Sequence, residues 1–410
     1  MDRMKQYFRN WTFADYSIAS VLLVFAAYNK LMPVLMAPLF FSLVMKRRDW
    51  NEFKKLFQLT EPGFWFICFY TVHVFGLVNS ENMNYALSDL GMKLSFLILP
   101  VLLFGADSKM TSKQVIDMML FGLLIACFTA YSYAVYRSLY NAEDNHWAYF
   151  TGSYLPVMMH RSYFATYMAI GAILSASRFF QTKRWSYILL TSVFSITAVL
   201  TFSKAGILIL IVTLFPAVLI LTFRYYSRAI GLALTGLCIA GIFLIFNVSD
   251  TLSARFNKML EGATNVSVKN NNTVESSEAR MIMWATSIQL FSENPITGVG
   301  TGDVSDALDT RNKRLGNWGV AEKSYNSHNQ FLNTGVQLGL LGLIPLILIF
   351  ITSIWKGIRN NSFPFVMVTV ILLLSLLFES FLETQQGIIP VTLFIIIFSL
   401  KPVDSQRLSA

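Results

Sequence analysis

The sequence predicts an all-α polytopic membrane protein with about 12 transmembrane helices and one large outer loop that itself contains helices. The chain has 410 residues, of which 55% are hydrophobic and only 13% are charged, whereas soluble domains carry about 25% charged residues. Apolar runs long enough to cross about 30 Å of hydrocarbon recur along the chain. Because basic residues lie in short loops between these runs, the net charge of +9 indicates orientation in a lipid bilayer and not nucleic-acid binding.

The predicted spans divide the chain into three segments. Residues 1–247 hold spans one to nine, residues 248–330 form the long outer loop, and residues 331–410 hold the last three spans and a tail. The spans are expected at residues 13–29, 31–45, 62–79, 86–105, 114–136, 161–178, 186–201, 203–223, 229–247, 331–355, 363–380 and 386–400.

Lysine and arginine are concentrated in alternate loops, and this alternation predicts the orientation of the spans. The opposite short loops contain only Lys30, Arg137, Arg161 and Lys204. By the positive-inside rule the basic side is cytoplasmic, so we expect both termini in the cytoplasm and the long loop outside. No cleavable signal peptide is expected, because the N-terminus is too polar.

The long outer loop contains a predicted amphipathic helix and a glycine-rich turn. The helix corresponds to SEARMIMWATSIQLFSEN, and Pro295 follows its end. The turn is PITGVGTGD, at 295–303. It lacks the strand and helix that flank a nucleotide-binding loop, so we interpret it as an ordinary turn.

Ionisable side chains stand out at the outer ends of several spans and on the loop helix. Such groups at the hydrocarbon edge are costly, and they usually mark a pathway or a site. The candidates come from elements that are far apart in the sequence. They are Arg161, Lys204, Arg280, His328, Glu379 and Glu383.

Each candidate also has a purely structural explanation. The basic residues that open spans could extend to lipid headgroups, and Arg280 could be solvated on a surface helix. His328 could anchor a helix whose glycines Gly335, Gly339 and Gly342 share one face and admit a close neighbour. The two glutamates, four residues apart on one helix face, could pair with a cation to hold the bundle together.

The combination of candidates is typical of chemistry on a lipid-linked phosphate or diphosphate. Arginine binds phosphate oxygens in pairs and lysine acts as a point charge. A neutral histidine beside them could accept a proton from an attacking hydroxyl, and fixed cations stabilise charge on the leaving group. The outer segments have no DxD-type or clustered metal-ligand signature, so we expect no metal and no other cofactor.

The chain resembles the O-antigen ligase family, within the superfamily of O-antigen ligases, O-antigen polymerases and bacterial O-oligosaccharyltransferases. The resemblance rests on FSKAGILIL at 202–210, EARMIMW at 278–284, PITGVG at 295–300, HNQFLNTGVQLGLLG at 328–342 and ESFLETQQG at 379–387. It implies metal-independent, inverting glycosyl transfer at the periplasmic face of the bacterial inner membrane. The donor would be a glycan on undecaprenyl diphosphate, and the acceptor would be lipid A–core oligosaccharide.

The resemblance also implies roles for particular residues. His328 would act on the acceptor hydroxyl, Arg161 and Arg280 would bind the diphosphate, and Lys204 would support the phosphate. Arg280 would thereby share in catalysis with His328. Lys204 stands where the second motif commonly has arginine, and Ser327 stands where some relatives have a second histidine. Supporting positions are Asn329, Glu379 and Glu383.

Three alternatives stay open at the level of sequence. A polymerase and a protein O-oligosaccharyltransferase share the donor chemistry and differ in the acceptor, and the overall motif resemblance favours the ligase. A transporter or flippase would be a different class. Transporters place functional groups near the bilayer midplane, whereas the charged candidates here gather at one boundary.

Overall fold

The computed structural model is all-helical over the residues that it describes, which are 6–44, 50–140, 146–226, 228–232 and 276–401. Within these ranges no β-strand occurs. The α-helices are α2 (Phe13–Val24), α3 (Met32–Val44), α4 (Trp50–Lys55), α5 (Pro62–Phe75), α6 (Met83–Lys93), α7 (Ser95–Gly105), α8 (Ser112–Tyr140), α9 (Arg161–Thr182), α10 (Ser186–Leu200), α11 (Lys204–Tyr225), α14 (Ser276–Glu293), α15 (Val304–Arg314), α16 (Trp318–Ala321), α17 (Gln330–Arg359), α18 (Phe363–Phe378) and α19 (Gln385–Leu400). Short 3₁₀ helices are η1 (Asn29–Leu31), η2 (Gly76–Asn79), η3 (His146–Phe150), η4 (Gly152–Tyr154) and η5 (Phe381–Glu383).

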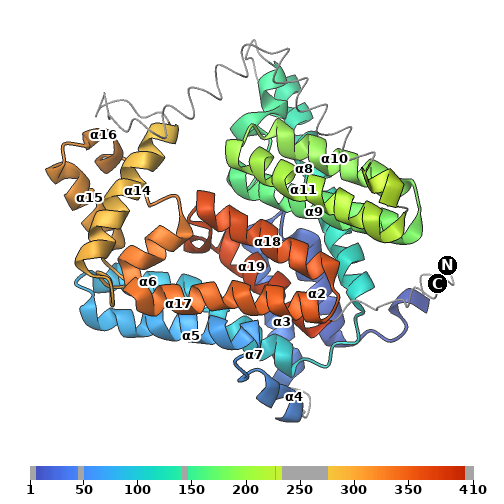
Figure 1. The fold of residues 1–410 in the computed structure, drawn as a ribbon, viewed down its shortest axis with the longest axis horizontal. Coiled ribbons are helices and arrows are strands. Elements are labelled where there is room, and N and C mark those ends of the chain that lie inside the picture. The colour runs from blue at the N-terminus through green and yellow to red at the C-terminus, as the bar shows by residue number, and fades with distance from the viewer. Residues whose placement is uncertain (1–5, 45–49, 141–145, 227, 233–275, 402–410) are drawn as a thin grey trace.

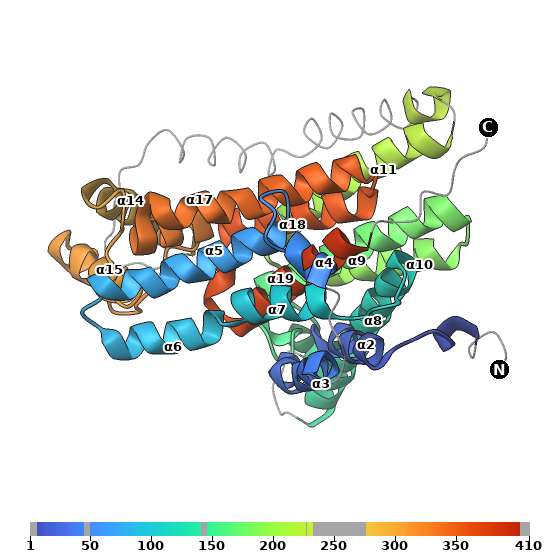
Figure 2. The same cartoon turned by 90° about the horizontal axis from the view of Figure 1, so that it is seen from below.

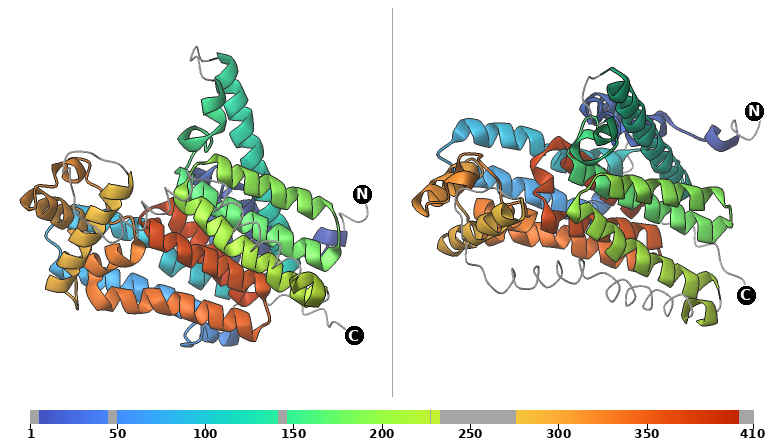
Figure 3. Two further views of the ribbon diagram at one scale, coloured as in Figure 1. Left: turned by 45° about the horizontal axis from the view of Figure 1, so that its top comes forward. Right: turned by 90° about the horizontal axis from the view of Figure 1, so that it is seen from above.

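The helices form two groups that meet along α18 and α19. In one group α17 packs along α5 and α18, and α19 packs on α7 (Figure 1). In the other group α9 packs on α10, α11 and α8. The short helices α14, α15 and α16 gather at one end, beside the start of α17 (Figure 2). The C-terminal end of α8 projects beyond the other helices (Figure 3).

Helix α9 lies at the centre of the second group and is buried along most of its length. Its buried residues include many small and polar ones, such as Ser175 and Ser177. Because protein surrounds this helix, it needs no continuous apolar surface. Gly206 lets α11 approach α9 closely, since a Cβ there would lie 2.3 Å from the Cβ of Ala165.

Five helical stretches among the described residues are long and apolar enough to cross a membrane. The others that match predicted spans are shorter apolar helices, apart from α9, which is long but not apolar enough. The predicted span 229–247 lies outside the described residues from position 233 onward. The count of twelve therefore stays a prediction. The five are Pro62–Asn79, Met83–Gly105, Ser112–Tyr140, Lys204–Tyr225 and Gln330–Arg359.

The helix ends fall into two contacting sets, as the alternation of basic loops predicts. At one end Asp15 accepts a hydrogen bond from Ser108, and Lys401 donates to the Ser108 carbonyl. These three residues belong to predicted cytoplasmic ends. At the other end, the Asp303 carboxylate accepts the Asn82 backbone N–H at 2.8 Å, which joins two predicted outer segments. Each of these contacts joins ends that are predicted to lie on one side, and the orientation in the membrane stays a prediction.

Helix α17 is interrupted at Gly339, whose φ and ψ are 59° and −151°. The PITGVG segment lies in this break and bonds to the backbone groups that the break frees. Val299 N–H donates to the Val336 carbonyl at 2.8 Å, and Leu340 N–H donates to the Pro295 carbonyl at 2.8 Å. Unpaired backbone groups are costly inside a membrane protein. The glycine-rich turn therefore completes the broken helix.

The predicted glycine face of this helix is wrong at its centre. Gly339 is not helical, so it does not share one helix face with Gly335 and Gly342. A Cβ at Gly339 would lie 2.4 Å from the carbonyl carbon of Ile296. Glycine is therefore required at position 339 because the PITGVG segment packs closely against it. The predicted reason, close packing of a neighbouring helix, does not apply at this position.

The predicted loop helix is confirmed as α14. Its buried residues Ala279, Ile282, Met283 and Leu290 recur at helical spacing. They form a small apolar core with residues of α15 and of the first turns of α17. This core fixes α14 beside the start of α17, and Arg280 lies on the same helix.

Candidate functional site

The Glu379 carboxylate collects side chains from three distant parts of the chain. Arg280 of α14 pairs with Oε1 at 2.6 Å, and His328 Nδ1 lies 3.3 Å from Oε2. Ser162 of α9 donates its hydroxyl hydrogen to Oε1 at 3.0 Å. Glu379 itself is only 7% exposed. The structure thus brings together Arg280, His328 and Glu379, which the sequence analysis selected separately.

The two glutamates do not share a helix face, which corrects the sequence prediction. Helix α18 ends at Phe378, and Glu379 is extended, with φ −146° and ψ 147°. Glu383 follows in η5 and pairs with Lys93 at 2.9 Å. The prediction that a glutamate pairs with a candidate cation is confirmed for Glu379 and Arg280. Glu383 instead pairs with Lys93, which is not among the predicted site residues.

The charge of Glu379 determines how the His328 ring is held. Burial raises the pKa of Glu379, but the hydrogen bond from His328 and the charge of Arg280 outweigh burial, so this pKa lies below its usual value. An ionised carboxylate only accepts hydrogen bonds, so His328 Nδ1 carries the proton of that bond. In the neutral form of the ring, Nε2 is then the nitrogen that carries the lone pair. This arrangement orients His328 and leaves it able to accept a proton.

The short run from Ser327 to Asn329 gives each residue a separate task. Ser327 is buried and shares a hydrogen bond of 2.8 Å with Ser287 of α14. Asn329 caps α17 by accepting the N–H groups of Phe331 and Leu332. Between them His328 has a φ of 45°, a left-handed conformation that costs about 1 kcal/mol or more in a non-glycine residue. Strained residues of this kind cluster at functional sites.

Arg161 and Lys204 open the neighbouring helices α9 and α11. Ser203 caps α11 by accepting the Gly206 N–H at 3.2 Å, and its hydroxyl lies 3.3 Å from that of Ser162. Arg161 is half-buried and Lys204 is exposed. Both basic residues are therefore adjacent in sequence to the Ser162–Ser203 contact, whereas the described hydrogen bonds to Glu379 come from other side chains.

His160 is a site residue that the sequence analysis missed. Its ring caps α9, with Nδ1 accepting the Ser162 N–H at 3.4 Å. Burial lowers the pKa of His160, and Arg161, His328 and Arg280 lower it further against the opposing effect of Glu379. The His160 ring therefore feels the charges of the candidate residues. The available signal was its position directly before a helix start, where it stands next to the predicted site residue Arg161.

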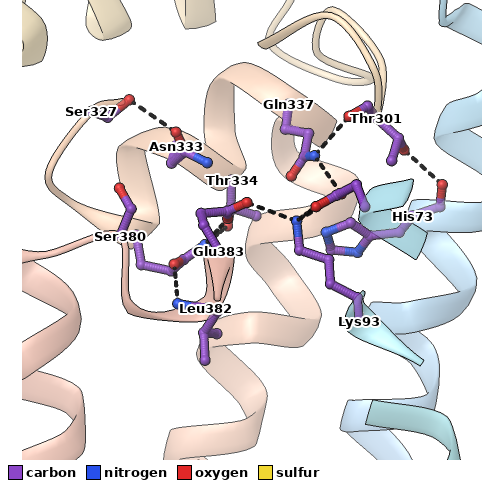
Figure 4. Close-up of polar contacts among 12 residues, drawn as sticks. His73, Lys93, Thr301, Ser327, Asn333, Thr334, Gln337, Ser380, Leu382 and Glu383 are labelled. Atoms are coloured by element: carbon purple, nitrogen blue, oxygen red, sulfur yellow. Dashed lines mark hydrogen bonds and ion pairs between the residues drawn. The ribbon is translucent and has the colours of Figure 1, made fainter. Parts of the chain in front are cut away.

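A second polar cluster surrounds Glu383, four residues after Glu379, and was also missed. Lys93 binds Asp89 and Glu383, and Gln330 donates to the other oxygen of Glu383 at 2.7 Å (Figure 4). Burial raises the pKa of Glu383, but Lys93 and Gln330 outweigh burial and lower this pKa below its usual value. Lys93 and Asp89 lie four residues apart inside a predicted apolar span, and this ion-pair spacing was the available signal.

Within the described residues, no three His, Cys, Asp or Glu side chains gather as metal ligands would. Cys68 and Cys127 are free cysteines in α5 and α8.

A protein of Haemophilus influenzae described as uncharacterized is 28% identical to this chain over 201 residues. The match covers 47% of this chain and 49% of that protein, so the chain spans about half the length of the relative that it matches.

Residues 187–347 match the family model described as O-antigen ligase. This stretch includes Lys204, Arg280 and His328, whereas Arg161 and the two glutamates lie outside it. Over residues 187–347, which are less than half of its 410 residues, the chain is thus similar to the O-antigen ligase family.

Proposed function

We propose that this protein is an O-antigen ligase that works at the periplasmic face of the bacterial inner membrane, with both termini in the cytoplasm. It transfers a glycan from undecaprenyl diphosphate to a sugar hydroxyl of lipid A–core oligosaccharide. The observation that carries the proposal is the Glu379 carboxylate, which holds His328 through Nδ1 and Arg280 through Oε1. A proton acceptor and an anion-binding group are thereby fixed side by side.

The proposed reaction is a single displacement. The acceptor hydroxyl oxygen attacks the anomeric carbon, and the bond from that carbon to the diphosphate oxygen breaks. His328 Nε2 accepts the hydroxyl proton, and undecaprenyl diphosphate leaves with the bonding electrons. One displacement inverts the anomeric configuration. His328 then returns its proton to solvent, and Glu379 keeps the ring oriented throughout.

Two features support binding of the diphosphate beside His328. First, Arg280 bonds Glu379 through one nitrogen, Nη2, and its remaining N–H groups are suited to phosphate oxygens. Second, the helices α9, α11 and α17 all begin beside Glu379. Ser162 and His328 contact Glu379 directly, and Ser203 contacts Ser162. Helix N-termini present free N–H groups and partial positive charge to anions. Arg161 and Lys204 add full charges at two of these ends.

The test is the glycolipid profile of a deletion strain complemented with wild type or with His328→Ala. We expect the variant to leave free lipid A–core and to accumulate polymer on the carrier, because no group accepts the hydroxyl proton. Single repeats still attached to core would instead identify a polymerase, and glycan missing from protein serine or threonine would identify a protein O-oligosaccharyltransferase.

A second assay separates transfer from transport. The purified protein in detergent is mixed with carrier-linked glycan and lipid A–core in the absence of any membrane gradient. We expect wild type to form the linked product and His328→Ala to form none. Lack of transfer by well-folded wild type would favour the transporter alternative, because transport requires two compartments.

A further inference from the structure

Lys93 occupies an unusual position for a lysine, because it is completely buried, with 0% exposure. Its Nζ lies 2.8 Å from both oxygens of Asp89, one turn earlier on α6, and 2.9 Å from Glu383 Oε2 (Figure 4). One cation thus joins two carboxylates from segments far apart in sequence. The contact ties α6 to the turn between α18 and α19.

Glu383 passes this attachment on to α17. Its second oxygen accepts a hydrogen bond from Gln330 Nε2 at 2.7 Å, and Gln330 Oε1 accepts the Leu382 N–H at 2.7 Å. Gln330 is the first residue of α17 and stands two positions after His328. The start of α17 is therefore fixed to the turn at two points, through Glu379 to His328 and through Glu383 to Gln330.

The same cluster also fixes the break in α17. Gln337 Nε2 donates to Asp89 at 3.1 Å and to the Thr301 carbonyl at 2.9 Å. Gln337 lies two residues before Gly339, and Thr301 follows the PITGVG segment. Both ends of the first part of α17, from Gln330 to Gln337, are thus attached to the pair formed by Lys93 and Asp89.

Stability alone is a weak explanation for this arrangement. Taking two carboxylates and an ammonium group out of water is expensive, and well-packed apolar residues often replace such clusters without loss of stability. What apolar residues cannot supply is a directional attachment at a particular atom. A misplacement of about 1 Å at a reacting group can cost about 100-fold in rate.

We propose that Lys93 is a positioning residue for His328, acting through Glu383 and Gln330. The inference rests on the proposed glycosyl transfer. Lys93 touches no reacting atom. It sets the position of the turn that carries Glu379 and of the first turn of α17, and these two elements together aim the His328 ring.

The test compares Lys93→Met with a matched control, Lys356→Met, in the purified full-length protein. Lys356 lies in the last turn of α17 and binds Glu61, the residue directly before α5, at 2.5 Å. This ion pair also joins α17 to another helix, but at the end of α17 that is far from His328. Readouts are thermal unfolding, KM for the carrier-linked donor, and kcat. For Lys93→Met we expect kcat to fall about 10- to 100-fold with donor KM within about 3-fold, the pattern of lost alignment. For Lys356→Met we expect a comparable loss of stability and an unchanged kcat.

A second variant, Gln330→Leu, removes the hydrogen bond between Gln330 and Glu383 and leaves the ion pairs of Lys93 intact. Its kcat therefore tests the inference even if Lys93→Met does not fold. We expect the same selective fall in kcat. Wild-type kcat in Gln330→Leu, or equal kcat values in the two lysine variants, would overturn the inference. His328→Ala in the same assay keeps the two proposals apart, because activity in that variant would refute the proposed function itself.

Discussion

At the scale of single residues, the proposed site depends most on Glu379. It bonds Arg280, His328 and Ser162 at once and is almost completely buried. A neutral amide at this position would keep the size of the side chain. It would lose the charge that fixes the proton on His328 Nδ1, so the ring could present the wrong nitrogen.

For Glu379→Gln we therefore expect kcat for glycosyl transfer to fall about 10²- to 10⁴-fold while the protein still folds. Kinetics of the purified variant and its thermal unfolding curve check this together. Ser292→Ala, which changes an exposed serine on α14, serves as the control and should match wild type. A Glu379→Gln enzyme with full kcat would show that the carboxylate does not orient His328.

At the scale of elements, the break in α17 depends on one glycine. The φ of 59° with ψ of −151° at Gly339 is a conformation that essentially only glycine adopts. A Cβ there would also collide with the Ile296 carbonyl. The broken helix and the PITGVG segment thus require each other.

We expect Gly339→Ala to lower the free energy of unfolding by about 3 kcal/mol or more, from strain and overpacking together. Gly91→Ala is the matched control, because Gly91 lies in α6 and a Cβ there meets nothing within 4 Å. That control should be neutral or stabilising by up to about 1 kcal/mol. Thermal unfolding of both variants in one detergent makes the comparison, and equal midpoints would contradict the requirement for glycine.

At the scale of the whole molecule, the predicted orientation can be tested with two conservative substitutions. Ser292 on α14 and Ser186 at the start of α10 are both exposed, and they belong to opposite sets of helix ends. In a background without native cysteines, Ser292→Cys should react with a membrane-impermeant thiol reagent in intact spheroplasts. Ser186→Cys should react only after permeabilisation. The reverse pattern would place the Glu379 cluster in the cytoplasm.

Sequence patterns predicted the helical class, the grouping of helix ends and α14, because hydropathy and loop charge are local signals. They also selected Arg280, His328 and Glu379, since ionisable groups at a span boundary are conspicuous. They did not predict that α18 ends at Phe378, and so they assigned Glu379 and Glu383 to one helix face. Beyond that helix end, Glu379 pairs with the distant Arg280 and Glu383 with the distant Lys93, and no local pattern contains these contacts.

The roles of Lys93 and Gly339 also depend on contacts between distant parts of the chain. Lys93 and Asp89 stand four residues apart in one predicted span, which is a local pattern, but their third partner Glu383 joins them only in the folded chain. Gly339 looked like one member of a helical glycine stripe, and only the docked PITGVG segment reveals its left-handed backbone. Tertiary contacts decided both positions.

The shared carboxylate of Glu379 has a thermodynamic consequence. An anion that binds the remaining N–H groups of Arg280 shares its positive charge with Glu379, and it leaves more of the carboxylate's charge to His328. By reciprocity, any event that strengthens the bond between Glu379 and His328 makes Arg280 more available to the anion. Occupation of one half of the cluster and the readiness of the other half are therefore linked through single hydrogen bonds, with no movement of a helix required.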